Sequence, residues 1–448
     1  MLTRPELRKN FNDILKLYTE IDNLIEQKGI KEGVKLFELQ TVGNKMMEAN
    51  SNFYQSGVVL GKQSFTTLAT ESENKRDLAM SFLAMIYSAW TLENKTEFNV
   101  LEIGAGSGDL MKEIFTIREE VMASESSSEM HKNFFKSLKF NIVDYPEMIA
   151  IQRKKLGENA KEVNFIAQDI SKELIEGTFD FIYANEIPDT QRVDFLEVKI
   201  DEKTSEKKFF LRAIKKSATG ESSEVLAGIS SSPEIIAEIG KNLFPIEDLE
   251  PGVYKLQFGF HALMHNIKQS LKPPFGAFIL SDYYSFIKED STHNLFFAGS
   301  DGSSRNEECM FIKIGEPGRQ LIEAIKKYGV VDVTYPPNVG KDTSELFNFI
   351  VTNFSEDDRS NAILCIKFKS EKSINLLKED KLFGKYFKTI FENIGVRNRE
   401  LMETELTVCR TLGKINRTDT EPAGISSRFG AVQLSGDSTV SCTSGKDR

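Results

Sequence analysis

The sequence has few of the residues that mark several common protein classes. Only four cysteines occur in 448 residues, and none forms a Cys-x-x-Cys pair. Such scattered cysteines favour free thiols over a disulfide framework or a zinc site. No apolar run reaches the roughly 18 residues of a membrane span, and the first residues lack an apolar signal core. We therefore expect a cytoplasmic protein.

The chain also has no excess of basic residues. Its formal net charge is −10, with 57 Lys and Arg against 67 Asp and Glu. This balance argues against a generic nucleic-acid binder, because phosphate binding needs a basic face, and it suits a cationic substrate. The apolar content of 40% is ordinary for a globular protein. The length allows two or three domains with sizeable cores.

Residues 99–110 contain an apolar run that enters a loop with glycine at every second position. Glycine lets the backbone turn sharply and lets a ligand approach where a Cβ would block it. The order of strand, glycine loop and helix is typical of the nucleotide-handling turn of a doubly wound sheet. With Glu102 before Gly104, Gly106 and Gly108, the stretch resembles motif I of class I S-adenosylmethionine (SAM) methyltransferases. The alternative is a glycine-rich turn without a ligand.

Helical periodicity dominates residues 1–95 and predicts a mostly helical N-terminal cap. The first helix begins after Thr3, the N-cap of a capping box, and ends at Gly29. A second amphipathic stretch follows through 34–47, and a further helix is predicted at 73–90.

From residue 96 short apolar runs alternate with helical stretches, as expected of an α/β protein with a parallel sheet. The fold expected is a class I methyltransferase fold, a Rossmann-like mixed sheet of the seven-stranded type with a substrate-side insertion. The first five strands are predicted at 98–103, 120–124, 163–167, 179–184 and 276–283. A hairpin is predicted at 195–200 and 208–214. Helices are predicted at 129–156, 254–271 and 320–328, and further strands at 310–314, 330–334 and 362–368.

These patterns divide the chain into four parts. The cap (1–95) precedes a SAM-binding methyltransferase core (96–295) with an insertion at 190–250. An α/β part at 296–410 completes the core or forms a separate lobe. The Gly-, Ser- and Thr-rich tail at 411–448 is expected to be flexible.

Several polar residues follow the predicted strands, at the edge where ligands of open α/β sheets bind. Glu125, at the predicted end of strand two, could take both ribose hydroxyls of the cofactor. Gln168 and Asp169, at the end of strand three, could contact the adenine edge. Glu102 adds negative charge, which suits a sulfonium. The predicted cofactor-binding residues are Glu102, Gly104, Gly106, Gly108, Glu125, Gln168 and Asp169.

The segment Asn185-Glu186-Ile187-Pro188-Asp189, after strand four, resembles the Asn-Glu-x-x-Asp signature of the MidA-type methyltransferases. This family includes the mitochondrial complex I assembly methyltransferase. Further short motifs are similar to the family's and stand in the same order, over about residues 50–290: Ser64-Phe65-Thr66-Thr67 with Glu71, Ser230-Ser231-Ser232-Pro233, and Ile279-Leu280-Ser281-Asp282-Tyr283. The sequence departs from the family at Gln191-Arg192 and at Tyr284. The resemblance implies arginine N-methylation of a protein, with SAM as cofactor.

The loop after strand four carries residue types that suit such an acceptor. A guanidinium is protonated at neutral pH, and carboxylates can hold its fork of N–H groups. Glu186 and Asp189 can supply that pair, and Asn185 could orient the acceptor or the methionine carboxylate. These three are the predicted catalytic residues. The alternative is that the carboxylates are merely solvated or cap the next helix.

Three other functions stay open. The enzyme could methylate its own C-terminal tail, which carries Arg428 beside Phe429. It could act on a small molecule, or it could be a SAM-binding assembly factor without turnover. His261 and His265 are one helical turn apart, as metal ligands can be, but no third ligand is evident and no metal is predicted. The expected partner is a protein or peptide, with neither nucleic acid nor membrane.

Overall fold

The structure is a computed structural model. It describes residues 3–31, 34–35, 37–55, 75–93, 95–185, 187, 190–216, 222–242, 246, 249–272, 277–283, 295–298, 309–312, 331–334, 346–352 and 378–386. The helix predicted at 320–328, the strand predicted at 362–368 and the tail at 411–448 lie outside these residues. The motif at 64–71 lies outside them too.

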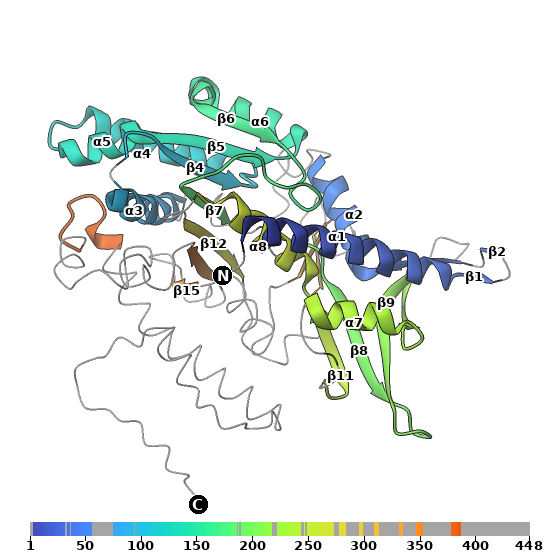
Figure 1. Ribbon diagram of the computed structural model, residues 1–448. Coiled ribbons are helices and arrows are strands. Elements are labelled where there is room, and N and C mark those ends of the chain that lie inside the picture. Colours follow the sequence, from blue (N-terminus) through green and yellow to red (C-terminus); the bar gives the residue numbers. More distant parts are fainter. Residues whose placement is uncertain are drawn as a thin grey trace, which may run out of the picture.

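A seven-stranded sheet forms the centre of the main unit (Figure 1). Its strands are β4 (Phe98–Ile103), β5 (Leu138–Asp144), β6 (Val163–Ala167), β7 (Phe181–Asn185), β12 (Ala277–Tyr283), β15 (Val331–Thr334) and β16 (Leu346–Thr352). They lie in the order β15-β16-β12-β7-β4-β5-β6. The strands from β12 to β6 are parallel, whereas β16 is antiparallel to both of its neighbours. The chain moves from β4 first to one side and then to the other, which makes β4 the topological switch point.

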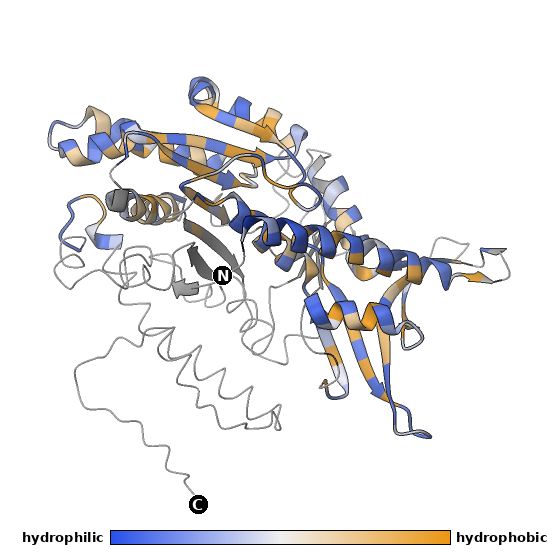
Figure 2. Cartoon of the chain, in the orientation of Figure 1, coloured by the Kyte–Doolittle hydropathy of each residue, from blue (hydrophilic) through white to orange (hydrophobic). Residues whose placement is uncertain are grey.

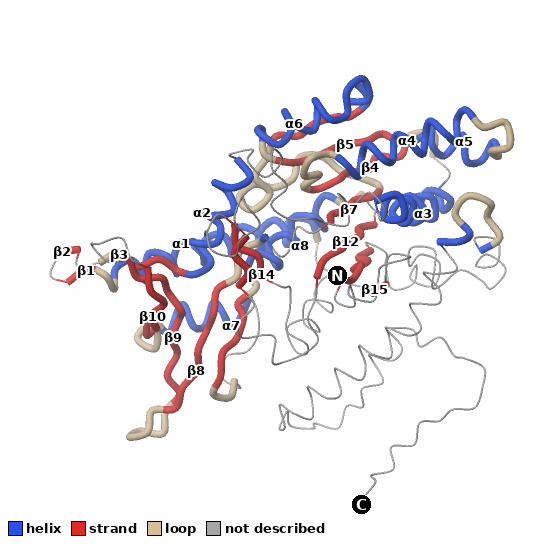
Figure 3. Tube along the Cα trace, turned by 180° about the vertical axis from the view of Figure 1, so that it is seen from behind, coloured by secondary structure: helices blue, strands red, loops and turns tan. Residues whose placement is uncertain are grey.

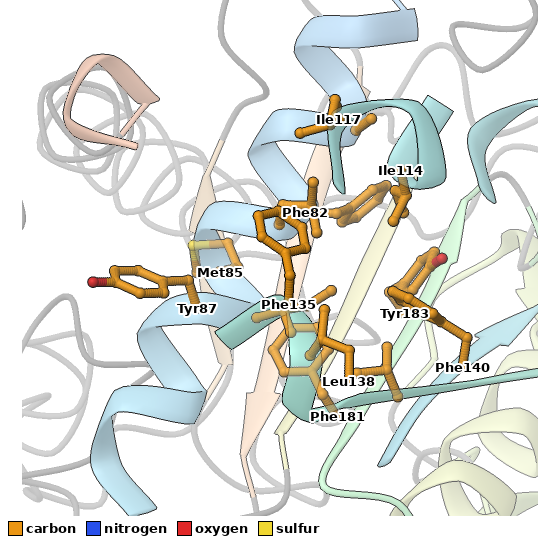
Figure 4. Close-up of a cluster of buried hydrophobic side chains, with 14 of the residues drawn as sticks. Phe82, Met85, Tyr87, Ile114, Ile117, Phe135, Leu138, Phe140, Phe181 and Tyr183 are labelled. Atoms are coloured by element: carbon orange, nitrogen blue, oxygen red, sulfur yellow. The ribbon is translucent and has the colours of Figure 1, made fainter. Parts of the chain in front are cut away.

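Helices α3 (Lys75–Glu93), α4 (Asp109–Ala123) and α5 (Glu129–Ser137) pack with the sheet in one large core. Figure 4 shows Phe82 of α3 beside Tyr183 of β7, and their rings stack with centroids 5.0 Å apart. Helix α3 is apolar around most of its circumference, as expected of a helix buried on several sides. Residues 378–386 contribute to that burial, since the Phe383 ring lies 4.9 Å from the Tyr87 ring.

A second, antiparallel sheet follows the main sheet in the chain. It contains β3 (Glu38–Thr41), β8 (Asp194–Ile200), β9 (Lys207–Lys216), β10 (Ser222–Gly228) and β11 (Gly252–Leu256), in the order β10-β9-β8-β11. Strand β3 pairs with the part of β9 that β8 does not reach. Hydrophobic and hydrophilic residues alternate along these strands (Figure 2), which is the pattern of a sheet with one well-buried face.

Three helices cover that buried face. They are α1 (Arg4–Gln27), α7 (Pro233–Asn242) and α8 (Phe258–Ser270), and α2 (Val42–Gln55) packs on the opposite face. Every residue of α8 is buried. Its end is joined to the start of β7 by the Phe179–Leu271 bridge. Figure 3 shows the antiparallel strands from behind, projecting away from β4 and β5.

The remaining described elements are short. They are α6 (Pro146–Leu156), a 3-10 helix at Gly157–Glu162, and the strand pairs β1 (Ile30–Lys31) with β2 (Val34–Lys35) and β13 (Leu295–Ala298) with β14 (Cys309–Ile312). Among the described helices, none is long and apolar enough to cross a membrane.

Many of the sequence predictions are confirmed. Helix α1 begins with the predicted capping box of Thr3 and Glu6, and the hairpin of β8 and β9 is present. The prediction for strand two is wrong, because residues 120–123 continue α4 and the strand is β5, within the helix predicted at 129–156. The helix predicted from 254 begins at Phe258, after strand β11, and residues 34–35 and 38–41 are strands rather than helix. The division of the chain at 95, 295 and 410 stays a prediction.

Candidate cofactor site

The glycine loop, residues 104–108, leaves β4 at the carboxyl edge of the parallel strands. Gly104, Gly106 and Gly108 have φ angles of 63°, 54° and 84°, a region that other residues rarely adopt. A Cβ on Gly106 would meet nothing within 4 Å. A Cβ on Gly104 would lie 2.1 Å from Cδ1 of Ile187. The loop therefore has open space over Gly106 and is approached closely at Gly104 by the segment that follows β7.

The carboxylate of Asp144 lies at the end of β5, beside this loop. Its Oδ1 accepts a hydrogen bond from the Tyr145 amide at 2.8 Å, and its Oδ2 accepts one from Nε2 of Gln152 at 2.7 Å. Burial raises the pKa of Asp144 to about 7, although these bonds and one from the Gly106 backbone act to lower it. Asp144 thus occupies the position at the end of strand two that the sequence prediction gave to Glu125.

Glu125 itself lies elsewhere. It follows α4, in the turn before α5. A helix after a parallel strand runs back along the sheet, so its end lies at the edge opposite the carboxyl ends of the strands. The prediction that Glu125 ends strand two is therefore wrong. A signal for Asp144 was present in the apolar pair Ile142-Val143 directly before it.

Glu102 lies on β4 with only 3% of its surface exposed. Its Oε2 accepts a hydrogen bond from the Tyr183 hydroxyl at 3.0 Å. Burial raises the pKa of Glu102 to about 8, the Tyr183 bond lowers it, and the charge of Asp144 raises it. Two carboxyls with raised pKa values therefore lie on adjacent strands next to the glycine loop, an arrangement that a cationic ligand would stabilise in its ionised form.

Gln168 and Asp169 follow β6, and their side chains shape the loop there. Nε2 of Gln168 donates to the Leu174 carbonyl, and its Oε1 accepts from the Glu176 amide. Asp169 accepts from the Ser171 amide and pairs with Lys172 at 2.9 Å. The Tyr145 hydroxyl also lies 3.4 Å from Asp169, so Asp169 is brought near the Asp144 end of the site.

The segment after β7 reaches over the glycine loop. Asn185 is the last residue of β7, and Glu186 and Asp189 lie outside the described residues. On either side of them the chain is held. Thr190 donates from its amide and hydroxyl to the Ile187 carbonyl, and Nδ2 of Asn50 donates to the Thr190 carbonyl at 2.9 Å.

Arg192 joins this segment to the antiparallel sheet. Its guanidinium donates to both oxygens of Asp22 on α1 and to Asp194 on β8, each at 2.8 Å. The side chain is only 5% exposed, and it lies over the Tyr18 ring. Removing one partner of such a buried network is strongly destabilising because a charge is left without compensation. The residue that departs from the family at position 192 thus holds the start of β8 against α1.

Other predicted features lie apart from the glycine loop. Residues 230–233 stand at the start of α7, on the antiparallel sheet. His261 and His265 are buried within α8. Among the described residues, no group of three His, Cys, Asp or Glu side chains could hold a metal ion.

The residues present fit SAM as a ligand. The glycine loop offers open space at Gly106 on a positive-φ backbone. The carboxyl of Glu102 lies on β4, and that of Asp144 ends β5. A seven-stranded sheet with one antiparallel strand next to its edge, and a ligand loop at its switch point, defines the class I SAM-dependent methyltransferases.

Comparison with known proteins places the chain within that class. Residues 82–306, half of the chain, match the family described as "Putative S-adenosyl-L-methionine-dependent methyltransferase". The chain belongs to this family and is a methyltransferase with SAM as its cofactor. No curated protein matches it in sequence.

Solved structures share the fold. A COG1565 superfamily protein from Burkholderia thailandensis is 15% identical with a TM-score of 0.50, and the match covers 80% of this chain and 96% of that one. A COG1565 member from the same organism, bound to S-adenosyl-homocysteine, is 16% identical with a TM-score of 0.50, covering 77% and 93%. The B. thailandensis 1,6-didemethyltoxoflavin-N1-methyltransferase is 15% identical with a TM-score of 0.32, covering 68% and 89%. The similarity to the two COG1565 structures shows the fold alone.

Proposed function

We propose that this methyltransferase modifies a nitrogen atom of a protein or peptide, and that the acceptor is an arginine guanidinium. The observation that carries the proposal is the position of the segment after β7. Ile187 lies against Gly104, and three residues later Thr190 is held by Asn50 of α2. An acceptor bound at Glu186 and Asp189 would thus lie between the glycine loop and the antiparallel sheet.

The cofactor half of the proposal assigns roles to three residues. A Cβ on Gly106 would point into open space, and we assign that space to the ligand. Asp144 accepts hydrogen bonds from the ribose hydroxyls, because it ends the strand next to the glycine loop and ionises near neutral pH. Glu102, whose pKa is about 8, becomes ionised when a positive charge lies nearby and then balances that charge.

The acceptor half of the proposal rests on the resemblance to the MidA-type methyltransferases and on the negative charges of Glu186 and Asp189. SAM supplies a methyl group on a positively charged sulfur, so alignment of the attacking nitrogen dominates the rate. Glu186 and Asp189 would hold the guanidinium fork and accept the proton that its nitrogen loses. Asn185 would orient the acceptor. The antiparallel sheet, anchored through Arg192, would bind the rest of a protein substrate.

Incubation with methyl-labelled SAM tests the proposal. The acceptors are a cell lysate, and peptides offered in pairs that differ only in Arg or Lys at one position. Label on the Arg member of a pair and on lysate protein supports the proposal. Label only on small molecules would replace it with metabolite methylation.

Two controls separate the alternatives left open by the sequence. Intact mass of the enzyme, with and without residues 411–448, detects methylation of its own tail. If SAM binds and no acceptor takes up label, the protein is an assembly factor without turnover and the arginine proposal fails.

A further inference from the structure

The side chain of Gln152 connects the two parts of the candidate cofactor site. Gln152 lies on α6 and is fully buried. Its Nε2 donates to Oδ2 of Asp144 at 2.7 Å and to the carbonyl of Gly106 at 3.0 Å. Both partners are acceptors, so only the amide nitrogen, with two N–H groups, can serve them together.

The two partners come from different strands. Asp144 ends β5, whereas Gly106 belongs to the loop that leaves β4. The main chain also joins these two segments, because the Gly104 amide donates to the Val143 carbonyl at 3.0 Å. The side chain of Gln152 joins the two segments a second time. A Cβ on Gly108 would lie 3.5 Å from Cα and 3.6 Å from Cβ of Gln152. Helix α6 therefore packs closely on the glycine loop.

The arrangement leaves one polar atom of Gln152 unsatisfied by the residues that the structure describes, which has a cost in stability. Oε1 of Gln152 is buried and has no hydrogen-bonding partner among the described residues. An unsatisfied buried acceptor lowers stability. An apolar side chain of similar size would avoid that penalty, yet it would leave Asp144 and Gly106 unconnected.

We propose that Gln152 is a positioning residue for the adenosine half of SAM. It holds the Asp144 carboxylate and the Gly106 carbonyl at a fixed separation, so that ribose and glycine loop meet in one geometry. The inference rests on the proposed role of Asp144. Gln152 itself is fully buried, so we place its action on the cofactor through Asp144 and Gly106.

The pH dependence of cofactor binding distinguishes a positioning role of Gln152 from a purely structural one, because Gln152 bonds to the titratable carboxyl of Asp144. The titratable groups near Asp144 are Glu102 on β4 and Tyr145 after β5. Asp169 is linked to them because the Tyr145 hydroxyl lies 3.4 Å from its carboxylate. The amide of Gln152 favours the ionised form of Asp144. Gln152→Glu would replace that donor with a second carboxyl, and the two acids would share one proton.

Calorimetric titration with S-adenosyl-homocysteine at pH 6, 7 and 8 measures the effect. We expect the wild type to bind more weakly as the pH falls, because Asp144 becomes protonated. Gln152→Glu should bind about 100-fold more weakly than wild type at pH 8 and recover in part as the pH falls, since its protonated acid has one O–H group and can donate to one of the two acceptors. Gln152→Leu should lose about tenfold in affinity, with its unfolding temperature within about 3 °C of wild type.

Ala150→Glu is the matched control. It adds the same charge to an exposed position on α6, and it should keep the wild-type pH dependence. If Gln152→Glu keeps the wild-type slope with pH and an affinity within about twofold of wild type, the inference is overturned. If Asp144→Asn also binds like wild type, the assignment of Asp144 fails first, which distinguishes the two failures.

Discussion

Replacing Asp144 with asparagine should stabilise the protein and lower its affinity for the cofactor. The pKa of Asp144 is about 7, against an ordinary 3.8, so the folded protein binds this proton more tightly than the unfolded chain. Between these two values the stability therefore falls as the pH rises, and above pH 7 the full penalty is present. A shift of about three pH units corresponds to about 4 kcal/mol.

The asparagine variant recovers only part of that penalty. Its Oδ1 can accept one hydrogen bond, from Tyr145 or Gln152, but its amide then faces the other donor. We expect a net gain of about 2 kcal/mol at pH 8, equivalent to a rise in unfolding temperature of about 4 °C. At pH 6 most of the gain disappears, because the wild-type carboxyl is then largely protonated.

Cofactor binding should change in the opposite direction. The ribose hydroxyls would lose a charged acceptor, and hydrogen bonds to charged groups contribute about 1.5–3 kcal/mol each. We expect an affinity for S-adenosyl-homocysteine about 100-fold lower at pH 8. Thermal unfolding at pH 6 and 8, with and without S-adenosyl-homocysteine, measures both effects. A variant that is less stable than wild type at pH 8, or is stabilised equally by the ligand, would refute this reasoning.

Three further substitutions test other parts of the site. Gly106→Val puts a branched side chain at a φ of 54° in the space left for the ligand, and calorimetry should detect no binding of S-adenosyl-homocysteine. Glu186→Gln should bind SAM normally and lower turnover by about 100-fold, as measured with labelled SAM; full activity would remove Glu186 from the catalytic set. Glu125→Gln should leave the affinity for S-adenosyl-homocysteine within about twofold of wild type, and a larger loss would contradict the position of Glu125 in the turn after α4.

The sequence predicts the parts of the fold in which local pattern and burial agree. The glycine loop is such a case, since β4 is an apolar run and α4 keeps helical spacing from Leu110 to Val121. The Thr3 capping box is another, because it depends on residues three apart.

Strand two was mispredicted because its pattern is hidden. Asn141 is a polar residue in the middle of β5, yet it is buried and donates to the Val100 carbonyl. Residues 121–123, in contrast, are an apolar run at the end of a helix. Only pairing with β4 separates the two cases, and that pairing is not local. The error also affected the predicted site, because Glu125 was placed at the strand end that Asp144 occupies.

The role of Gln152 could not be predicted from local pattern. Its contacts join residues 8 and 46 positions away in the chain, so they exist only once α6 has packed on the glycine loop. Arg192 is similar, since its partner Asp22 lies 170 residues earlier.

A crystal structure with S-adenosyl-homocysteine tests the central claim most directly, because it locates the ligand on the chain. Our account predicts the ligand over Gly106, with its ribose hydroxyls within hydrogen-bonding distance of the Asp144 carboxylate and Gln152 still bridging Asp144 and Gly106. A ligand bound elsewhere, or a ribose that contacts neither Asp144 nor the glycine loop, would contradict it.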